Sequence, residues 1–246
     1  MYFRKLQTVL LLVAVATLLA ACATRSISNS GYDANVERGY APRDNPFYKG
    51  ELSEFAVLGI DENAPVSEAD IQRALSERSR IVMPRGTSIM LVQSGAMIPD
   101  DDMVKDLGRF YNVAVFSGVP PEKSVSTGNF SRALRLAAAR GGADRIVVYW
   151  GILESGRENL ATKVVSWVPF VGGVIPDENQ RMRIRMKVAV VDVKSGTWEV
   201  FSPEPFEDTS VSGRYSRASS DQTQVALLKG KAYKSTAEDM VKRFAR

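Results

Sequence analysis

Between residues 67 and 153 the sequence alternates three times between a helical pattern and a short apolar run, and this alternation restricts the fold most. The last apolar run, Arg145 to Leu153, is apolar on both faces, as is typical of a central strand covered on both sides. Repeated helix–strand alternation predicts an α/β layer structure. The expected helices are 67–80, 101–110 and 129–140, and the expected strands are 88–93, 112–116 and 145–153.

The chain changes character after residue 153. Residues 157–167 and 179–193 have the pattern of two long antiparallel strands, and a helix is expected from about Asp221 to Phe244. The predicted fold class is therefore α/β, becoming α+β in the C-terminal half. It comprises a mixed sheet with three helix–strand units, a long antiparallel hairpin and a C-terminal packing helix.

Two acidic patterns are best explained by helix starts. Ser67 and Asp70 have the spacing of a capping box, and Ile71, Ala74 and Leu75 would then form the apolar stripe of that helix. The run 100–102 consists of three aspartates and precedes another helical pattern. Acidic residues favour a helix N-terminus, so we interpret this run as a helix start rather than a cation site.

The N-terminus has the features of a secretory signal. Arg4 and Lys5 precede an apolar run from Val9 to Ala21, which is too short for a transmembrane helix. The next residue, Cys22, is the only cysteine of the 246 residues, and Leu19 to Cys22 resembles the bacterial lipoprotein signal. That resemblance implies a covalent lipid on Cys22, with acyl chains such as palmitate.

This signal predicts the domain organisation and the location. Residues 1–21 would be the signal peptide, 22–50 the lipidated cysteine and a tether, and 51–246 a single periplasmic domain. Ala23 and Thr24 follow the cysteine, and neither is the aspartate that retains related lipoproteins at the inner membrane. We therefore expect an outer-membrane lipoprotein whose domain faces the periplasm.

Two absences exclude most hydrolytic mechanisms. The sequence has no histidine and no cysteine besides Cys22, so a Ser-His-Asp triad, a Cys-His pair and a histidine zinc site are all impossible. Carboxylate pairs or Ser–Lys chemistry remain open. No metal and no cofactor other than the lipid is indicated. After removal of the signal the net charge is about +2, which gives no reason to expect nucleic acid.

Two neighbouring stretches are candidate contact sites. An apolar segment with two glycines and two prolines could insert into a membrane or a partner, or fold back onto the core; its apolar members are Trp167, Phe170, Val171, Val174 and Ile175. Cations alternate with apolar residues in the following strand and would share one face: Arg181, Arg183, Arg185 and Lys187. That face is either simply solvated or binds anions, for which arginine is well suited.

Residues 129–150 (NFSRALRLAAARGGADRIVVYW) resemble a unit of small periplasmic α/β lipoproteins. Those are the curli secretion-channel lipoprotein and the N-terminal domain of the Tol–Pal translocation protein. The whole pattern is similar to Gram-negative outer-membrane lipoproteins without an assigned activity. No catalytic residue is implied.

We expect a non-enzymatic role in envelope assembly or partner binding through the 157–187 hairpin. Possible partners are an envelope protein, lipopolysaccharide or peptidoglycan. The alternatives are an oligomeric export or channel component and a histidine-free hydrolase.

Overall fold

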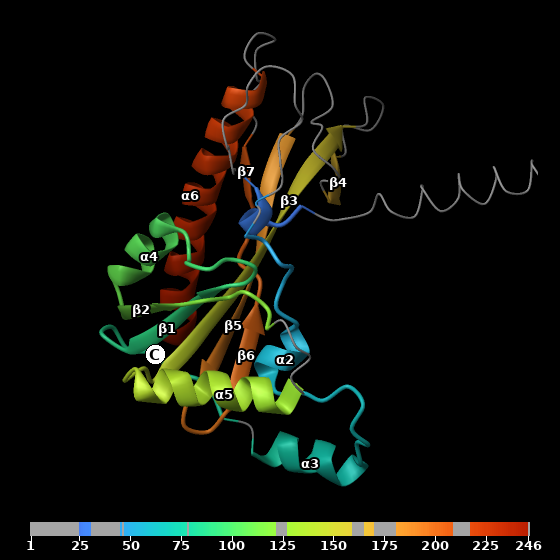
Figure 1. Ribbon diagram of the computed structural model, residues 1–246, viewed down its shortest axis with the longest axis vertical. Coiled ribbons are helices and arrows are strands. Elements are labelled where there is room, and N and C mark those ends of the chain that lie inside the picture. Colours follow the sequence, from blue (N-terminus) through green and yellow to red (C-terminus); the bar gives the residue numbers. More distant parts are fainter. Residues whose placement is uncertain are drawn as a thin grey trace, which may run out of the picture.

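The computed structural model describes residues 25–30, 45, 47–77, 79–121, 127–158, 165–169, 181–208 and 217–245. They form one mixed sheet with helices on both faces (Figure 1), which confirms the predicted fold class. The helical elements are η1 (Ile27–Asn29), α2 (Glu54–Leu58), α3 (Glu68–Ser76), α4 (Asp101–Gly108), α5 (Thr127–Arg140) and α6 (Arg217–Phe244). The strands are β1 (Ser88–Gln93), β2 (Asn112–Phe116), β3 (Arg145–Glu158), β4 (Val165–Pro169), β5 (Arg181–Asp192), β6 (Trp198–Phe201) and β7 (Phe206–Asp208).

Two long strands form the centre of the sheet. The strand order is β2-β1-β3-β5-β6, and β3 and β5 pair in antiparallel fashion from Arg145↔Asp192 to Gly156↔Arg181. At one end of this pair β1 flanks β3 and β6 flanks β5, whereas at the other end β4 and β7 take these places. Among the strands that the structure describes, only the pairings of β1 with β2 and β3 are parallel.

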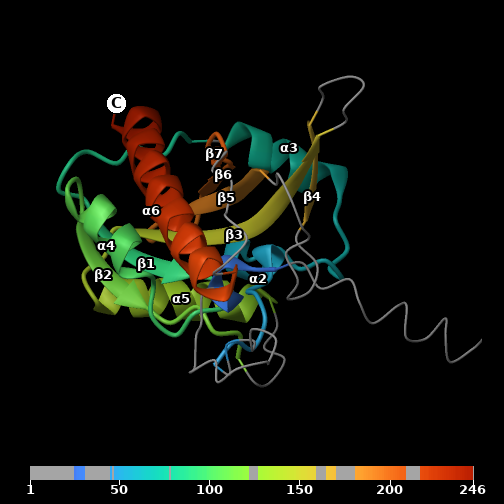
Figure 2. The ribbon, with the colours of Figure 1, turned by 90° about the horizontal axis from the view of Figure 1, so that it is seen from above.

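Helices cover both faces of the sheet, and each face has its own apolar cluster. On one face α4 and α6 pack through side chains such as Leu107 and Leu228. On the other face α2 and α5 pack through Val57 and Leu134. Figure 2 shows α6 running across the first face with α5 on the opposite side. The sheet is therefore a covered central layer, as the doubly apolar pattern of β3 predicts.

The predicted helix–strand units are present, but one helix is not buried. Ser67 and Asp70 form the expected capping box, which starts α3. The predicted apolar stripe of α3 does not pack: Ile71 is 45% exposed and Leu75 is 60% exposed. Periodicity shows that a helix has an apolar face but not that another element covers it.

The long antiparallel pair is present with different members from those expected. We expected residues 157–167 to pair with 179–193, but β5 pairs with β3 along its length. β4 lies on the opposite edge of β3, where Gly156 faces Trp167. The physical reason is that β3 continues as a strand to Glu158, so it is long enough to pair with every residue of β5.

A short segment within the expected tether is docked on the domain. The Leu153 N–H donates to the Arg25 carbonyl at 3.1 Å, and Ser26 forms an antiparallel bridge with Ile152. Ile27 is only 1% exposed and belongs to the core cluster under α6. Residues 25–30 therefore differ from the flexible chain that their composition suggests.

Candidate functional site

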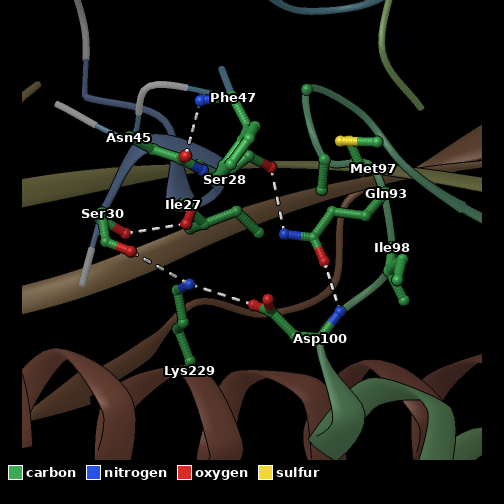
Figure 3. Close-up of a pocket in the computed structure, with 12 residues that line it drawn as sticks. Ile27, Ser28, Ser30, Asn45, Phe47, Gln93, Met97, Ile98, Asp100 and Lys229 are labelled. Carbon is green, nitrogen blue, oxygen red and sulfur yellow. Dashed lines mark hydrogen bonds and ion pairs between the residues drawn. The ribbon is translucent and has the colours of Figure 1, made fainter. Parts of the chain in front are cut away.

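A cavity of about 350 Å³ opens where the docked segment, the loop after β1 and α6 meet (Figure 3). η1 contributes Ile27 and Ser28, while Gln93 and Asp100 come from the end of β1 and the start of α4. Lys229 reaches the cavity from α6. Segments that are far apart in the sequence thus supply one mixed polar and apolar lining, which we call the Asp100 cavity.

Asp100 is the centre of the polar side of this cavity. Its carboxylate oxygen Oδ2 accepts a hydrogen bond from Lys229 Nζ at 3.0 Å and another from the Tyr233 hydroxyl. Asp100 precedes α4 but makes no side-chain capping hydrogen bond. The run of aspartates does mark a helix start, as predicted. The carboxylate of Asp100, however, accepts hydrogen bonds from α6 instead of capping the N-terminus of α4.

A second group of hydrogen bonds converges on Gln93. Its side-chain carbonyl accepts from the Tyr149 hydroxyl at 2.5 Å and from the Asp100 backbone N–H at 2.7 Å. Its amide nitrogen donates to Ser28 Oγ at 3.1 Å, and Ser28 Oγ donates to the Ser94 carbonyl. Buried amides and hydroxyls need such partners, so these bonds hold the docked segment against β1 and β3.

Burial changes the acidity of the two tyrosines beside the cavity. Burial is the largest cause that raises the pKa of Tyr149 well above its ordinary value, and the nearby Asp100 charge adds to it. The pKa of Tyr233 is also raised well above normal, first by burial and then by the proximity of Tyr149 and Asp100. Both phenols are therefore neutral hydrogen-bond donors at physiological pH.

The serine hydroxyls of the cavity are engaged with the backbone. Ser30 Oγ donates to the Ile27 carbonyl at 2.9 Å, and Ser28 Oγ donates to Ser94. Lys229 Nζ lies 3.4 Å from the Ser30 carbonyl oxygen rather than from its hydroxyl. A serine nucleophile needs a base within hydrogen-bond reach of its hydroxyl, and these contacts point elsewhere. The described residues also contain no cluster of three or more potential metal-ligating side chains.

The predicted basic face of β5 lies on the side of the sheet away from α6. Met182, Ile184 and Met186 are buried in the core cluster under α6. Arg183, Arg185 and Lys187 alternate with them and therefore face the other side. The side chain of Arg181 lies outside the described residues, although its backbone pairs with Gly156.

Acidic side chains accompany these cations, a feature that the sequence analysis did not find. Glu154 is 0% exposed; its Oε2 accepts from Arg183 Nε at 2.6 Å, while its Oε1 accepts from Arg185 Nη2. Lys187 Nζ donates to Glu54 at the start of α2. The pairing of Glu154 with β5 depends on strand register, for which the sequence offers no local signal.

Glu154 is held in its charged form by the two arginines. Burial alone would raise the pKa of this carboxyl, but the hydrogen bonds from Arg185 and Arg183 outweigh it and the pKa is lowered. The carboxylate fixes both guanidinium groups, and the Arg185 side chain remains 49% exposed. Arg185 therefore presents a fixed, partly exposed guanidinium group at this point of the surface.

A cleft of about 340 Å³ lies beside this cluster, and we call it the Arg185 cleft. Arg185, Lys187 and Glu54 are among its polar lining residues, and Trp150 and Ile152 supply apolar surface. The Trp150 indole donates to the Leu52 carbonyl at 2.9 Å, which fixes the ring. The cleft therefore combines partly exposed cations with an apolar wall.

The remaining predicted residues are not placed by the structure. Cys22, Phe170, Val171, Val174 and Ile175 lie outside the described residues, and only the backbone of Trp167 is described, paired in β4. Whether the apolar segment is packed or inserted stays a prediction. None of the helices among the described residues is long and apolar enough to cross a membrane.

Comparison with protein families gives one match. The model of a family described as YafT bacterial lipoprotein matches residues 53–243, which is more than half of the chain. A search of curated proteins found no match. The resemblance of residues 129–150 to the curli and Tol–Pal proteins is not shown by these comparisons and stays a prediction.

Proposed function

We propose that this chain, which belongs to the YafT bacterial lipoprotein family, binds an anionic envelope partner through the Arg185 cleft. Membership makes it a membrane-anchored lipoprotein of the cell envelope. It also implies a covalently attached lipid, and Cys22 is the only cysteine that could carry one. The residues after Cys22 support the outer membrane as the location, with the domain in the periplasm.

The observation that carries the proposal is the arrangement of Arg183 and Arg185 around buried Glu154. A buried carboxylate that accepts from both guanidinium groups fixes their positions before any ligand arrives. Arg185 keeps donors that are not used by Glu154, because a guanidinium carries five N–H groups. Such a preorganised group binds carboxylate or phosphate with little loss of side-chain entropy.

Lys187 can contribute to the same ligand. Its ion pair with Glu54 is partly exposed, with the two side chains 42% and 43% accessible. Exposed pairs of this kind contribute only about 0–1 kcal/mol, so an incoming anion can compete with Glu54 for the ammonium group. Trp150 and Ile152 would contact an apolar part of the partner. This chemistry suits an acidic protein segment, a lipopolysaccharide phosphate or a peptidoglycan carboxylate.

The contacts favour binding over catalysis. The serines of the Asp100 cavity donate to backbone carbonyls, and Glu154 is kept ionised by two arginines rather than poised for proton transfer. We therefore propose a non-enzymatic role.

The test compares two double variants of the full-length lipidated protein. Arg185→Gln with Lys187→Gln should reduce binding about tenfold or more, because charge-assisted hydrogen bonds contribute roughly 1.5 kcal/mol or more. Arg73→Gln with Lys242→Gln is the control, since these side chains are 65% and 76% exposed in surface pairs.

Binding would be measured against purified lipopolysaccharide, peptidoglycan sacculi and cross-linked envelope proteins. Circular dichroism would show that all proteins are folded. Equal binding by the two double variants to every probe, or no binding by the parent protein to any probe, would refute the proposal.

A further inference from the structure

The chain between the lipidated cysteine and the folded domain is very short. Only Ala23 and Thr24 separate Cys22 from Arg25, whose carbonyl accepts from the Leu153 N–H. Three Cα–Cα steps of 3.8 Å allow a separation of at most about 11 Å between Cys22 and Arg25. The lipid of this family member therefore holds the domain against the bilayer.

Close to this attachment point the surface has an apolar rim. Ile27 and Ser28, two and three residues after Arg25, line the Asp100 cavity together with Phe47, Met97 and Ile98 (Figure 3). These last three side chains are large and apolar, and they are 57%, 59% and 68% exposed. Exposed apolar side chains that gather at one place on a surface mark a contact with a partner or a membrane.

The rim is held rigidly by the segments that carry it. The Asn45 N–H donates to Asn29 Oδ1 at 2.8 Å, and the Phe47 N–H donates to Asn45 Oδ1 at 3.0 Å. Phe47 is thus connected to η1 through side-chain hydrogen bonds.

The loop that carries Met97 and Ile98 packs against the same segment. Gly95 has a φ of +78° and approaches the Tyr48 ring so closely that a Cβ at this position would lie 2.7 Å from it. The Gly95 N–H donates to the Gly118 carbonyl, and the Gly118 N–H donates to the Ala96 carbonyl. Phe47, Met97 and Ile98 are therefore displayed together rather than on independent loops.

We propose that Phe47, Met97 and Ile98 lie in the headgroup region of the bilayer that holds the lipid anchor. The occupant of the rim is the membrane itself, because the short chain from Cys22 brings this surface, and η1 with it, to the lipid. The Arg185 cations lie on the sheet face away from α6, whereas Phe47, Met97 and Ile98 surround the Asp100 cavity; Ser26 and Tyr48 connect the two sites, because they line the Arg185 cleft next to Ile27 and Phe47. This inference rests on the family and the anchor length, and not on the proposed partner.

A depth measurement tests this orientation. Met97→Cys is made in the full-length protein, where the Cys22 thiol is blocked by its lipid, and the new thiol is labelled with an environment-sensitive fluorophore. Leu136→Cys is the matched control, because Leu136 is also an exposed apolar residue, 52% accessible, but lies on α5. The lipidated proteins are reconstituted into vesicles of phosphatidylethanolamine and phosphatidylglycerol that contain a lipid with a nitroxide high on its acyl chain.

We expect the nitroxide to quench roughly half or more of the fluorescence of the label in Met97→Cys, since interfacial side chains reach ~5–10 Å into the bilayer boundary. The label in Leu136→Cys should lose about a tenth or less of its fluorescence. Adding Phe47→Ser and Ile98→Ser should at least halve the quenching at Met97 while vesicle flotation stays complete. Equal quenching at Met97 and Leu136 would overturn the proposal. Unchanged quenching in the serine variant would overturn the assignment of the rim as the contact.

Discussion

Glu154 lies directly opposite Arg183 across the β3–β5 pair, and its Oε2 accepts from Arg183 Nε at 2.6 Å. Glu154 has no exposed surface and the Arg183 side chain is 15% exposed. Removing Glu154 deprives both Arg183 and Arg185 of a buried acceptor, and breaking a buried ion pair is strongly destabilising. This pair therefore links the fold to the proposed binding cleft.

Glu154→Ala is expected to lower the free energy of unfolding by about 3–5 kcal/mol, the usual range for a broken buried ion pair. Asp239→Ala is the control, because Asp239 pairs with a Lys242 side chain that is 76% exposed. That change should cost less than about 1 kcal/mol. Urea unfolding of both variants, followed by circular dichroism, would contradict the prediction if the two costs were alike.

Acid should weaken the same pair. The pKa of Glu154 is lowered in the folded protein, so the unfolded chain binds the proton more tightly. The stabilisation is then fully present above the unfolded-state pKa of about 4.3 and is lost as the pH falls through the folded-state value. We expect the difference in urea midpoint between the parent protein and Glu154→Gln to shrink as the pH falls below about 5. A difference that is independent of pH would show that Glu154 ionisation does not contribute.

Alkali should act through the tyrosines of the Asp100 cavity. The pKa values of Tyr149 and Tyr233 are raised in the folded state. The contribution of the two tyrosines to the free energy of unfolding is therefore present below the unfolded-state pKa of about 10 and is lost as the pH rises through the folded-state values. The Tyr149→Phe, Tyr233→Phe double variant should therefore lose less stability than the parent between neutral and strongly alkaline pH. Urea midpoints measured along this series test the prediction, and parallel losses in the two proteins would contradict it.

Ile27 tests whether the docked segment belongs to the folded core. Ile27→Ala should cost about 2 kcal/mol, because the side chain is 1% exposed among core residues. Ile71→Ala is the same substitution on α3 at a side chain that is 45% exposed, and it should change stability by roughly 0.5 kcal/mol or less. If the two isoleucine variants have equal urea midpoints, Ile27 does not contribute to the core.

Two glycines give a further matched pair. A Cβ on Gly118 would lie 1.8 Å from the Gln93 carbonyl oxygen, so Gly118→Ala forces backbone movement and should cost about 1–3 kcal/mol. A Cβ on Gly108, within α4, meets nothing within 4 Å, and Gly108→Ala should stabilise by roughly 0.5–1 kcal/mol. Thermal or urea unfolding separates the two effects, which have opposite signs. A neutral Gly118→Ala variant would contradict the close approach of β1 and the segment after β2.

Local signals in the sequence predicted the elements well. The Ser67–Asp70 spacing marks the start of α3, and apolar runs mark β1 and β2, because capping and strand formation depend on residues a few positions apart. Arg183, Arg185 and Lys187 alternate with buried residues along β5, since the period of a strand is fixed by its geometry, whereas the side chain of Arg181 lies outside the described residues.

Contacts between distant residues could not be predicted in the same way. Tyr233 donates to Asp100 from 133 positions away, and Arg183 binds Glu154 through the register of two strands. Neither relation leaves a periodic trace in the sequence. The docking of Ile27 was missed because the residues around it are polar, and it depends on space above Gly151 that only the folded sheet provides.

The space above Gly151 places the docked segment in direct contact with the central strand β3. A Cβ on Gly151 would lie 2.7 Å from Ile27 Cδ1, so the absence of a side chain lets the isoleucine wedge onto the middle of β3. With the proposed lipid on Cys22 and the proposed partner at the Arg185 cleft, a pull between the two would enter the protein at residues 25–27, which contact β3 directly. The neighbouring β5 carries the proposed binding residues and pairs with β3 over its whole length. Such tension would thus pass through the paired central strands β3 and β5 instead of through a peripheral loop.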